Sequence, residues 1–465
     1  MTMTSTATSV PIELLRKYDC PGPRYTSYPT APVWTGEVGS DDYVNALRTA
    51  ATHNDSPLAV YCHIPFCRSR CFYCGCNTCI TRNHDSIDSY IDALEREVDA
   101  VALHLGDRSR VSQLHFGGGT PTFIGDDGIE RIMQSLDRRF SFADDAERSI
   151  ELDPRVTTSD QLRYLARRGF NRVSLGVQDL DPVVQQAIGR IQPEPVVAKM
   201  LEECRHLDFR GINFDLIYGL PFQTTGRFRD TLHKVIAMRP DRLAVYSFAY
   251  LPSVKSNQAK IRPEDLPTTE EKYRLFALAV EMLTAAGYRQ IGMDHFALPD
   301  DELSIAQQDG RLHRNFMGYT VQAAPDMIGF GMSSIGYIDH SFFQNESGLD
   351  SYRKTIQQHG LAVYRGMRLS SDDLVRQYVI SSLMCNFFLP FDDFRRRFGV
   401  DFQSAFIDEC RHLKEFFRDD FLVKTDSGLA ITPVGRTFVR NIAMTFDAYL
   451  GDNGKGKPAT FSRTI

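Results

Sequence analysis

Strand-length apolar runs alternate with amphipathic helical stretches between residues 58 and 286. The apolar runs are Leu58–His63, Val111–Phe116, Arg148–Leu152, Arg172–Val177, Ile212–Tyr218 and Leu243–Phe248. The helical stretches are Ser86–Leu103, Gly128–Phe140, Ser159–Arg168, Val196–Leu207, Gly226–Met238 and Thr268–Ala286. Because a strand, a helix and a second strand form a right-handed unit with parallel strands, this alternation predicts an α/β fold with a parallel sheet. Six units indicate a partial (β/α)6 barrel, and Arg289–Met293 is a candidate seventh strand.

The flanking segments differ from this pattern. Residues 1–57 are predicted to form an N-terminal extension, with disordered first residues (1–10) and a short helix at Ile12–Tyr18. Within it, GPRYTSYPT (residues 22–30) holds two prolines and cannot be a regular helix. It is either a rigid surface turn or a segment over an active site. Residues 58–345 form the predicted barrel with its substrate-lining loops. Its glycine-rich, apolar stretch Ile328–Gly336 is expected either to line the active site or to be a plain connection to the next domain. Residues 346–465 form a mainly helical, winged-helix-like domain with a strand pair near Phe421–Ile431 and a loose tail after Gly451.

Six of the ten cysteines lie between residues 62 and 79, directly after the first predicted strand. Cys67, Cys71 and Cys74 have a CxxxCxxC spacing, which suits a 4Fe–4S cluster whose fourth iron lacks a protein ligand. An open iron can bind a substrate or cofactor, so the loop is predicted to be catalytic. A structural zinc site usually has four ligands in two separated pairs. A redox CxxC motif would use only two of these thiols.

Polar residues and glycines collect where the predicted strands end. They are the cysteine loop, the triplet Gly117–Gly119 with Thr120, Glu151 and Asp153, Gln178, Asp215, and the stretch Tyr246–Ala249. In parallel α/β folds, ligands bind at the C-terminal ends of strands. The triplet allows a ligand close to the backbone, although a plain tight turn would also use it. An unpaired charge at the end of an apolar strand is costly, so Glu151 fits a role in holding an amino or hydroxyl group.

The charge balance excludes one class of partner. The net charge of −6, from 53 basic and 59 acidic residues, argues against a general nucleic-acid binder and gives no reason to expect a membrane surface. No apolar run approaches the ~20 residues that span a bilayer. The first ten residues have no basic start and no apolar signal core. Together with free cysteines and an oxygen-sensitive cluster, this predicts a cytoplasmic protein.

The motif YxHIPFCxxxCxxCxC, at residues 61–76, resembles that of the radical S-adenosylmethionine superfamily. GPRYTSYPT, GGGTPT, SIELDPR, SLGVQD, DLIYGLP, GMDHFA, LHRNFMGYT and CNF are similar to motifs of its oxygen-independent coproporphyrinogen III oxidases (coproporphyrinogen dehydrogenases), and they extend over nearly the whole chain. The resemblance implies a radical-SAM partial barrel and an oxidative decarboxylation in haem biosynthesis. A 5′-deoxyadenosyl radical, made from S-adenosylmethionine at the 4Fe–4S cluster, would take a hydrogen atom from a propionate. Two propionates of coproporphyrinogen III would become vinyl groups, giving protoporphyrinogen IX.

The resemblance also implies roles for individual residues. Cys67, Cys71 and Cys74 match the cluster ligands, while Cys76 and Tyr61 match positions involved in activity. The S-adenosylmethionine joined to the cluster is expected at Tyr61, Gly118, Glu151 and Ile335. A second S-adenosylmethionine site is expected at Tyr73, Gly119, Thr120, Gln178, Arg190, Asp215 and Ala249. From its place in the sequence alone, Arg190 is expected on the solvent face of the helix after the fourth strand. GPRYTSYPT would cover the active site and help hold the substrate carboxylates.

Partners and a rival function follow from the same resemblance. The implied partners are coproporphyrinogen III and a flavodoxin- or ferredoxin-type electron donor, and the implied state is a monomer. The alternative is a haem-binding carrier of the superfamily. Such relatives typically lack the fourth cysteine, here Cys76, and the GPRYTSYPT extension, and this chain has both. Cys62 and Cys79 depart from the family pattern, and both are interpreted as incidental thiols because reactivity requires a lowered pKa.

Overall fold

The computed structural model describes residues 10–321, 324–450 and 461–464. The chain divides into unit 1, with residues 1–33, 216–321 and 370–465, and unit 2, with residues 34–215 and 322–369. These units group segments that are distant in the sequence, so the domain boundaries at 57/58 and 345/346 stay predictions. The first nine residues and residues 451–460, most of the two stretches predicted to be loose, lie outside the described residues. None of the described helices has the length and apolar character needed to cross a membrane.

Unit 2 is built on a sheet with the order β16-β15-β14-β13-β1-β4-β5-β6-β7. The strands are β1 (Leu58–Ile64), β4 (Arg110–Gly118), β5 (Ser141–Leu152), β6 (Arg172–Gln178), β7 (Gly211–Tyr218), β13 (Asp326–Phe330), β14 (Ile335–Ile338), β15 (Ser341–Asn345) and β16 (Val363–Arg368). Strands β13, β1, β4, β5 and β6 pair in parallel, and β14 to β16 continue antiparallel. Strand β1 is buried on both faces, as expected for a parallel sheet covered by helices. The unit boundary falls within β7, after Asp215.

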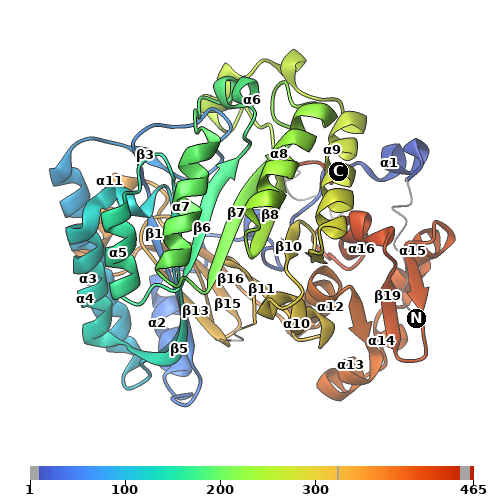
Figure 1. Cartoon of the computed structure of the whole chain (residues 1–465). Coiled ribbons are helices and arrows are strands. Elements are labelled where there is room, and N and C mark those ends of the chain that lie inside the picture. The colour runs from blue at the N-terminus through green and yellow to red at the C-terminus, as the bar shows by residue number, and fades with distance from the viewer. Residues whose placement is uncertain (1–9, 322–323, 451–460, 465) are drawn as a thin grey trace. The chain divides into compact units, whose positions relative to one another are not determined.

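Helices α3, α4, α5 and α7 lie along one side of this sheet (Figure 1). The helices of the unit are α2 (Ser40–Ala50), α3 (His84–Leu105), α4 (Gly125–Arg139), α5 (Ser159–Arg167), α6 (Pro182–Ala187), α7 (Glu194–His206) and α11 (Leu349–His359), with a 3-10 turn, η2 (Pro121–Ile124). The start of α3 is capped by Asn83, and that of α5 by a Thr158–Gln161 capping box. Along α3, Tyr90, Leu94, Val98 and Val101 recur at helical spacing and are buried, which explains why this stretch packs as an amphipathic helix.

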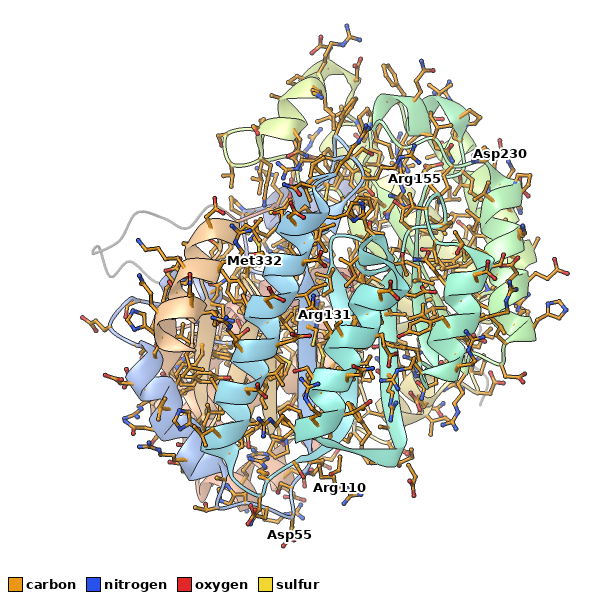
Figure 2. All side chains as sticks on the ribbon, turned by 90° about the vertical axis from the view of Figure 1, so that its left-hand side faces the viewer. Asp55, Arg110, Arg131, Arg155, Asp230 and Met332 are labelled. Carbon is orange, nitrogen blue, oxygen red and sulfur yellow. The ribbon has the colours of Figure 1, made fainter. Side chains whose placement is uncertain are left out.

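The parallel strands all end at the same edge of unit 2. Figure 2 shows Asp55, just before β1, and Arg110, at the start of β4, at one end of the unit, and Arg155, just after β5, at the other. The cysteine loop after β1, the glycine triplet at the end of β4 and Glu151 near the end of β5 therefore share one edge. The alternating pattern and its strand ends predicted this correctly.

Two predicted features differ in the structure, and the secondary structure of a third was not predicted. The glycine-rich stretch Ile328–Gly336, expected to line the active site or to be a plain connection, forms the end of β13, a turn and the start of β14. Ile328 and Phe330 in this stretch are buried because β13 pairs with β1, with Gly329 opposite Tyr61. The candidate seventh strand exists as β9 (Arg289–Ile291), but it does not extend the parallel series, because it pairs antiparallel with β10 (His295–Ala297). Arg190 is not in a helix; it lies between α6 and α7.

In unit 1, β10 lies between β8 (Arg242–Ser247) and β9 and is antiparallel to both. The remaining elements before residue 321 are α1 (Ile12–Tyr18), η1 (Ala31–Val33), α8 (Thr225–Met238), η3 (Ser256–Lys260), η4 (Pro263–Asp265), α9 (Thr269–Ala285), α10 (Glu302–Gln308), β11 (His313–Asn315) and β12 (Gly318–Thr320). Helix α1 matches the predicted N-terminal helix.

The C-terminal part of unit 1 is mainly helical, as predicted (Figure 1). Its elements are α12 (Ser371–Asn386), β17 (Phe388–Pro390), α13 (Phe391–Phe398), α14 (Phe402–Ala405), α15 (Ile407–Arg418), β18 (Leu422–Lys424), β19 (Gly428–Ile431), η5 (Gly435–Phe438) and α16 (Val439–Met444). The predicted strand pair is β18–β19, and β17 adds a third antiparallel strand to it. Leu15 and Tyr18 of α1 pack into the core that these helices form, so this part of the predicted N-terminal extension belongs to unit 1, whereas residues 34–57 belong to unit 2.

Candidate active site

The cysteine loop of unit 2 is closed at its base by a short parallel ladder. Strand β2 (Phe66–Cys67) pairs with β3 (Cys79–Ile80), so Cys67 and Cys79 lie at the two ends of the loop. The Cys79 amide also donates to the Pro65 carbonyl at 2.8 Å. Cys62 is fully buried within β1, and burial raises the pKa of both Cys62 and Cys79. Both extra thiols are therefore protonated at neutral pH, which agrees with their interpretation as incidental.

The three predicted cluster ligands lie near one another in this loop. Burial raises the pKa of Cys67 to about 11, and the charges of Cys74 and Cys71 add to the increase. The Cys74 amide donates to the Cys71 carbonyl at 3.3 Å, and the Cys67 sulfur lies 3.5 Å from the hydroxyl of Thr120. Within the described residues, no three His, Cys, Asp or Glu side chains are arranged around one point as a metal site. The assignment of the ligands therefore depends on the motif and on the chemistry of the neighbouring groups.

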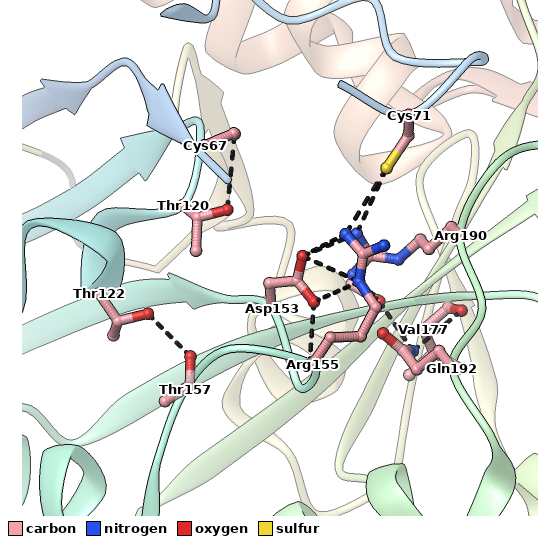
Figure 3. Close-up of polar contacts among 11 residues, drawn as sticks. Cys67, Cys71, Thr120, Thr122, Asp153, Arg155, Thr157, Val177, Arg190 and Gln192 are labelled. Atoms are coloured by element: carbon pink, nitrogen blue, oxygen red, sulfur yellow. Dashed lines mark hydrogen bonds and ion pairs between the residues drawn. The ribbon is translucent and has the colours of Figure 1, made fainter. Parts of the chain in front are cut away.

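Two arginines face Cys71 (Figure 3). The guanidinium groups of Arg155 and Arg190 donate to its sulfur at 3.7 and 3.8 Å. Both also bind Asp153, Arg155 at 2.6 Å and Arg190 at 3.0 Å. Burial alone would raise the pKa of Asp153, but these two arginines lower it, so the carboxylate is ionised. Two cations beside one carboxylate leave a positive charge next to a thiol. This suits thiolates that carry an anionic iron–sulfur cluster.

Arg190 is a site residue and not a solvent-exposed helix residue. It is 6% exposed, and it donates to the Gly176 carbonyl at 2.7 Å as well as to Asp153. Its charge also acts on Tyr73, whose pKa is raised first of all by burial. A buried guanidinium needs such partners, because leaving a charge unpaired in the interior is costly. The contacts depend on residues that lie far from Arg190 in the sequence.

The glycine triplet joins the end of β4 to the cysteine loop. The amide of Gly119 donates to Ile64 at 2.8 Å and that of Thr120 donates to Phe66 at 2.9 Å. A side chain on Gly118, whose φ is +118°, would place its Cβ 2.6 Å from the His63 ring. A Cβ on Gly119 would lie 2.7 Å from two backbone oxygens of the loop. The triplet therefore permits a close approach between two segments of the site.

Glu151 is held ionised beside the triplet. Burial would raise its pKa, but hydrogen bonds from His115 and from the Gly118 amide (2.9 Å) lower it. Tyr61 stacks on the His115 ring, with centroids 5.9 Å apart. The Tyr61 hydroxyl donates to His63 Nδ1 at 3.0 Å, since His63 Nε2 donates to the Asn77 carbonyl. The half-exposed carboxylate can thus accept hydrogen bonds from a ligand next to an aromatic face.

Asp215 lies on β7 near the same edge, and its pKa is shifted in the opposite direction from that of Glu151. Burial and the charge of Glu151 raise its pKa to about 7, although the hydroxyl of Ser174 and the amide of Asn213 donate to it at 3.0 and 2.9 Å. Ser174 is the register partner of Glu151. Gln178, which ends β6, has a positive φ of 67°. Glu151 and Asp215 are thus two carboxyl groups with different protonation near neutral pH.

The remaining predicted positions are divided between the two units. Ile335 opens β14 of unit 2, and Cys76 is exposed on the cysteine loop. Ala249 belongs to unit 1, where it follows β8. Its carbonyl accepts a hydrogen bond from Gln258 at 3.1 Å.

GPRYTSYPT lies in unit 1, beside a small polar cavity. This cavity is lined by Arg24, Tyr218, Ser247, Tyr273, Phe276, Met293, Asp294, Thr437, Arg440 and Thr464. Arg24 forms an ion pair with Asp294, and its carbonyl accepts from Arg314 at 3.0 Å. Burial would raise the pKa of Asp294, but Arg24 and His295 hold it well below its ordinary value. The segment is thus held by specific polar contacts and is not a free surface turn.

Several residues of the site were not predicted from the sequence. They are His63, His115, Ser174 and the guanidinium of Arg155. His115 and Gly117 are two residues apart on β4, and Ser174 has the same spacing to Gly176 on β6. The two-residue periodicity of strands, applied upstream from each strand end, would have identified His115 and Ser174.

The chain is similar to known proteins over almost its whole length. A family model described as the radical SAM superfamily matches residues 61–235, and one described as the HemN C-terminal domain matches residues 369–438. The oxygen-independent coproporphyrinogen III oxidase of Salmonella typhimurium is 43% identical over 456 residues, 98% of each chain. That of Pseudomonas aeruginosa is 44% identical over 97% of this chain and 98% of the relative. The chain belongs to the oxygen-independent coproporphyrinogen III oxidase family.

A solved structure of this family has the same fold. The coproporphyrinogen III oxidase (HemN) of Escherichia coli, described as a radical SAM enzyme, matches with a TM-score of 0.90 and 40% identity. The match covers 96% of this chain and all of the E. coli chain. The predicted radical-SAM architecture with a helical C-terminal part is therefore confirmed. As a radical SAM enzyme of the oxygen-independent coproporphyrinogen III oxidase family, the chain is expected to use a 4Fe–4S cluster and S-adenosylmethionine.

Proposed function

We propose that this chain converts coproporphyrinogen III to protoporphyrinogen IX without oxygen, as a step of haem biosynthesis. Two propionate side chains lose CO2 and become vinyl groups. The observation that carries the proposal is the 43% identity, over 98% of the chain, to a relative named for this reaction. The site supports it, because a loop of three thiols beside two arginines suits a cluster of the kind that this superfamily uses.

Cys67, Cys71 and Cys74 would hold the 4Fe–4S cluster, and Tyr61, Gly118, Glu151 and Ile335 would hold S-adenosylmethionine beside it. When bound, the cluster and S-adenosylmethionine supply the 5′-deoxyadenosyl radical that takes a hydrogen atom from the propionate. Arg155 and Arg190 offset the negative charge of the thiolates. Glu151, kept ionised, accepts hydrogen bonds from the amino or hydroxyl groups of the cofactor. Tyr61 is neutral, because burial raises its pKa, so it acts as a hydrogen-bond donor and not as a base.

A second S-adenosylmethionine site is part of the proposal. Within unit 2, it would use Tyr73, Gly119, Thr120, Gln178, Arg190 and Asp215. Arg190 supplies a fixed positive charge for a carboxylate, whereas Asp215 can act as a hydrogen-bond donor or acceptor near neutral pH. Cys76 is exposed on the loop and would act near the cluster without binding it. In unit 1, Arg24 of GPRYTSYPT is a candidate partner for a substrate carboxylate.

We also infer the setting in which the chain works. All ten cysteines are free thiols, which fits a reducing compartment such as the cytoplasm. The exposed residues Arg68 and Arg70 on the cysteine loop would suit an acidic electron donor such as a flavodoxin or a ferredoxin. A monomer is the proposed state.

An anaerobic assay tests the proposed reaction. The reconstituted protein would be given dithionite, S-adenosylmethionine and coproporphyrinogen III, and the products would be identified by mass spectrometry. We expect protoporphyrinogen IX and 5′-deoxyadenosine from the wild type and from Cys79→Ser, and neither from Cys71→Ala. Deoxyadenosine without a vinyl product would reject coproporphyrinogen as the substrate. Haem binding with neither product would favour the carrier.

A further inference from the structure

Glu97 of α3 is a buried carboxylate of unit 2 that lies outside the site described above. It is 1% exposed, and it accepts three hydrogen bonds. The donors are the Gly331 amide at 2.8 Å, the Tyr352 hydroxyl at 2.7 Å and the Asn345 side-chain amide. Among the described residues, no arginine, lysine or histidine forms an ion pair with it. A buried charge that is stabilised only by neutral donors is costly to maintain, so its position calls for a functional explanation.

Two of these three donors, Gly331 and Asn345, also bond to each other at the turn between β13 and β14. The Asn345 side chain also donates to the Gly331 carbonyl at 3.0 Å, and the Ser334 hydroxyl donates to the same carbonyl at 2.7 Å. From a second position on α3, the Tyr90 hydroxyl accepts from the Met332 amide at 3.1 Å and donates to the His63 carbonyl at 2.6 Å. Met332 is labelled in Figure 2. Buried bonds therefore attach the turn directly to α3 and β15. They join it to α11 through Glu97 and to the end of β1 through Tyr90.

This turn leads directly into the proposed cofactor site. Ile335 is the first residue of β14, four residues after Gly331. The backbone of Gly329 is so close to Ile335 that a Cβ on Gly329 would lie 2.6 Å from the Ile335 carbonyl. Gly329 is also the register partner of Tyr61 on β1. Where the turn lies thus determines where Ile335 lies relative to Tyr61.

We propose that Glu97 is a positioning residue for S-adenosylmethionine, which acts by holding the Gly331–Ile335 turn in its binding-competent position. The proposal rests on the proposed function, because that function assigns Ile335 and Tyr61 to the cofactor. Glu97 itself touches neither reactant nor cofactor in this scheme.

The ionisation of Glu97 couples this support to pH. All three partners donate to the ionised carboxylate, so a proton on the carboxyl group would remove one donated bond, either by displacing a donor or by making the Tyr352 hydroxyl the acceptor. The titratable groups that face Glu97 are Tyr43 of α2, Cys62 of β1, Tyr90 and Tyr352, and burial raises the pKa of each, so all four are neutral. Burial raises the pKa of Glu97 to about 7, against the opposing effect of its three donors. The full set of bonds therefore exists above about pH 7 and loses one donor below it.

The test uses Glu97→Gln and Tyr352→Phe in the reconstituted full-length protein, with Asp99→Asn as a matched control. Asp99 is on the same helix but pairs with Arg139 at the surface. Isothermal titration calorimetry would measure the dissociation constant of S-adenosylmethionine. Loss of one buried bond to a charged acceptor predicts about tenfold weaker binding for Glu97→Gln and several-fold weaker binding for Tyr352→Phe. Turnover at saturating S-adenosylmethionine should change by less than about twofold, since the residue supports binding and not chemistry.

Two further readouts separate this role from general structural support. Hydrogen–deuterium exchange of the Gly331 and Met332 amides, in protein without cofactors, should be faster in Glu97→Gln and unchanged in Asp99→Asn. Between pH 8 and pH 6, affinity for S-adenosylmethionine should change less in Glu97→Gln than in the wild type, because only Asp215 of the two carboxyl groups with a pKa of about 7 still titrates in the variant. Wild-type affinity and exchange in Glu97→Gln at pH 8 would overturn the proposal. If the wild type binds S-adenosylmethionine but leaves coproporphyrinogen III unchanged, the proposed substrate fails and the role of Glu97 stands. A wild type that does not bind S-adenosylmethionine would overturn both.

Discussion

At the scale of residues, two carboxyl groups at one sheet edge differ because their hydrogen-bond partners differ. Glu151 receives bonds from His115 and from a backbone amide, and these lower its pKa despite burial. Asp215 receives bonds from a hydroxyl and a side-chain amide, which do not offset burial and the charge of Glu151. The hydrogen-bond partners therefore keep Glu151 an ionised acceptor, whereas burial and the charge of Glu151 make Asp215 titrate near neutral pH.

Asp215→Asn is expected to reduce the decline of stability with rising pH. The pKa of Asp215 is about 7 in the folded chain against an ordinary value of 3.8, so its contribution is largest below pH 4 and is lost as the pH rises through 7. Each pKa unit corresponds to about 1.4 kcal/mol, so the decline attributable to Asp215 is on the order of 2–4 kcal/mol. Glu97 contributes a separate decline of the same sign.

Urea unfolding of the protein without cofactors, from pH 5 to pH 8, would measure this effect. Carboxyl groups with a lowered pKa, such as Asp153, are ionised in both the folded and the unfolded chain over that range. They therefore do not change the unfolding free energy with pH. The exposed Asp230→Asn is the control. If the unfolding free energy of Asp215→Asn fell with pH as steeply as that of the wild type, Asp215 would not have a raised pKa in the folded chain.

Arg190→Gln is expected to weaken cluster retention more than it weakens the fold. The substitution removes one of two cations beside Cys71 and one partner of the buried Asp153, which keeps Arg155. Breaking a buried ion pair typically costs about 3–5 kcal/mol, and the remaining pair with Arg155 should keep the cost near the lower value. Cluster retention would be measured as the iron content after anaerobic reconstitution, with the exposed Arg167→Gln as the control. Full iron content in Arg190→Gln would show that the charge is not needed.

At the scale of elements, the cysteine loop depends on a two-stranded ladder and on the glycine triplet. Strands β2 and β3 bring the ends of the loop together, and the amides of Gly119 and Thr120 attach it to β4. Neither ladder strand is longer than two residues, so the loop geometry relies on close backbone contact and not on an extended sheet.

Gly119→Ala is expected to prevent cluster assembly in a chain that still folds. Its Cβ would lie 2.7 Å from the carbonyl oxygens of Pro65 and Phe66, so the base of the loop would have to move. Gly75→Ala, in the same loop, is the matched control because no atom lies within 4 Å of its Cβ position. The visible absorption of the reconstituted cluster and far-ultraviolet circular dichroism would distinguish the two variants. Normal cluster absorption in Gly119→Ala would refute the packing argument.

At the scale of the whole molecule, residues near the two chain ends meet within unit 1. Pro21 forms a β-bridge with Arg463, and Arg463 pairs with Asp19. The buried guanidinium of Arg440 donates to the carbonyls of Gly22 and Pro23, directly before Arg24. The first residues of GPRYTSYPT are therefore held by groups from the other end of the sequence.

Arg440→Gln is expected to loosen GPRYTSYPT without affecting unit 2. Burial lowers the pKa of Arg440 to about 10, so it is charged at neutral pH and its bonds to carbonyls are charge-assisted. Their loss should cost about 3 kcal/mol locally. Hydrogen–deuterium exchange should rise for the Gly22 amide and stay constant for the Gly331 amide, with the exposed Arg396→Gln as control. Unchanged exchange at Gly22 would show that Arg440 does not hold the segment.

The sequence by itself determined the features that depend on near neighbours. Apolar periodicity identified β1, β4, β6, β7 and β8 and the helices that follow them, because strand and helix patterns repeat over a few residues. Cysteine spacing identified the loop, and motif similarity identified the family.

Only the tertiary structure decided the contacts between residues that are distant in the sequence. The burial of Arg190 depends on Asp153 and Gly176, the turn before Ile335 depends on Glu97, and β13 becomes a strand because β1 pairs with it. The physical reason is common to all three. The cost of burying a charge or a backbone amide is offset by its partner, and no local pattern specifies where that partner lies.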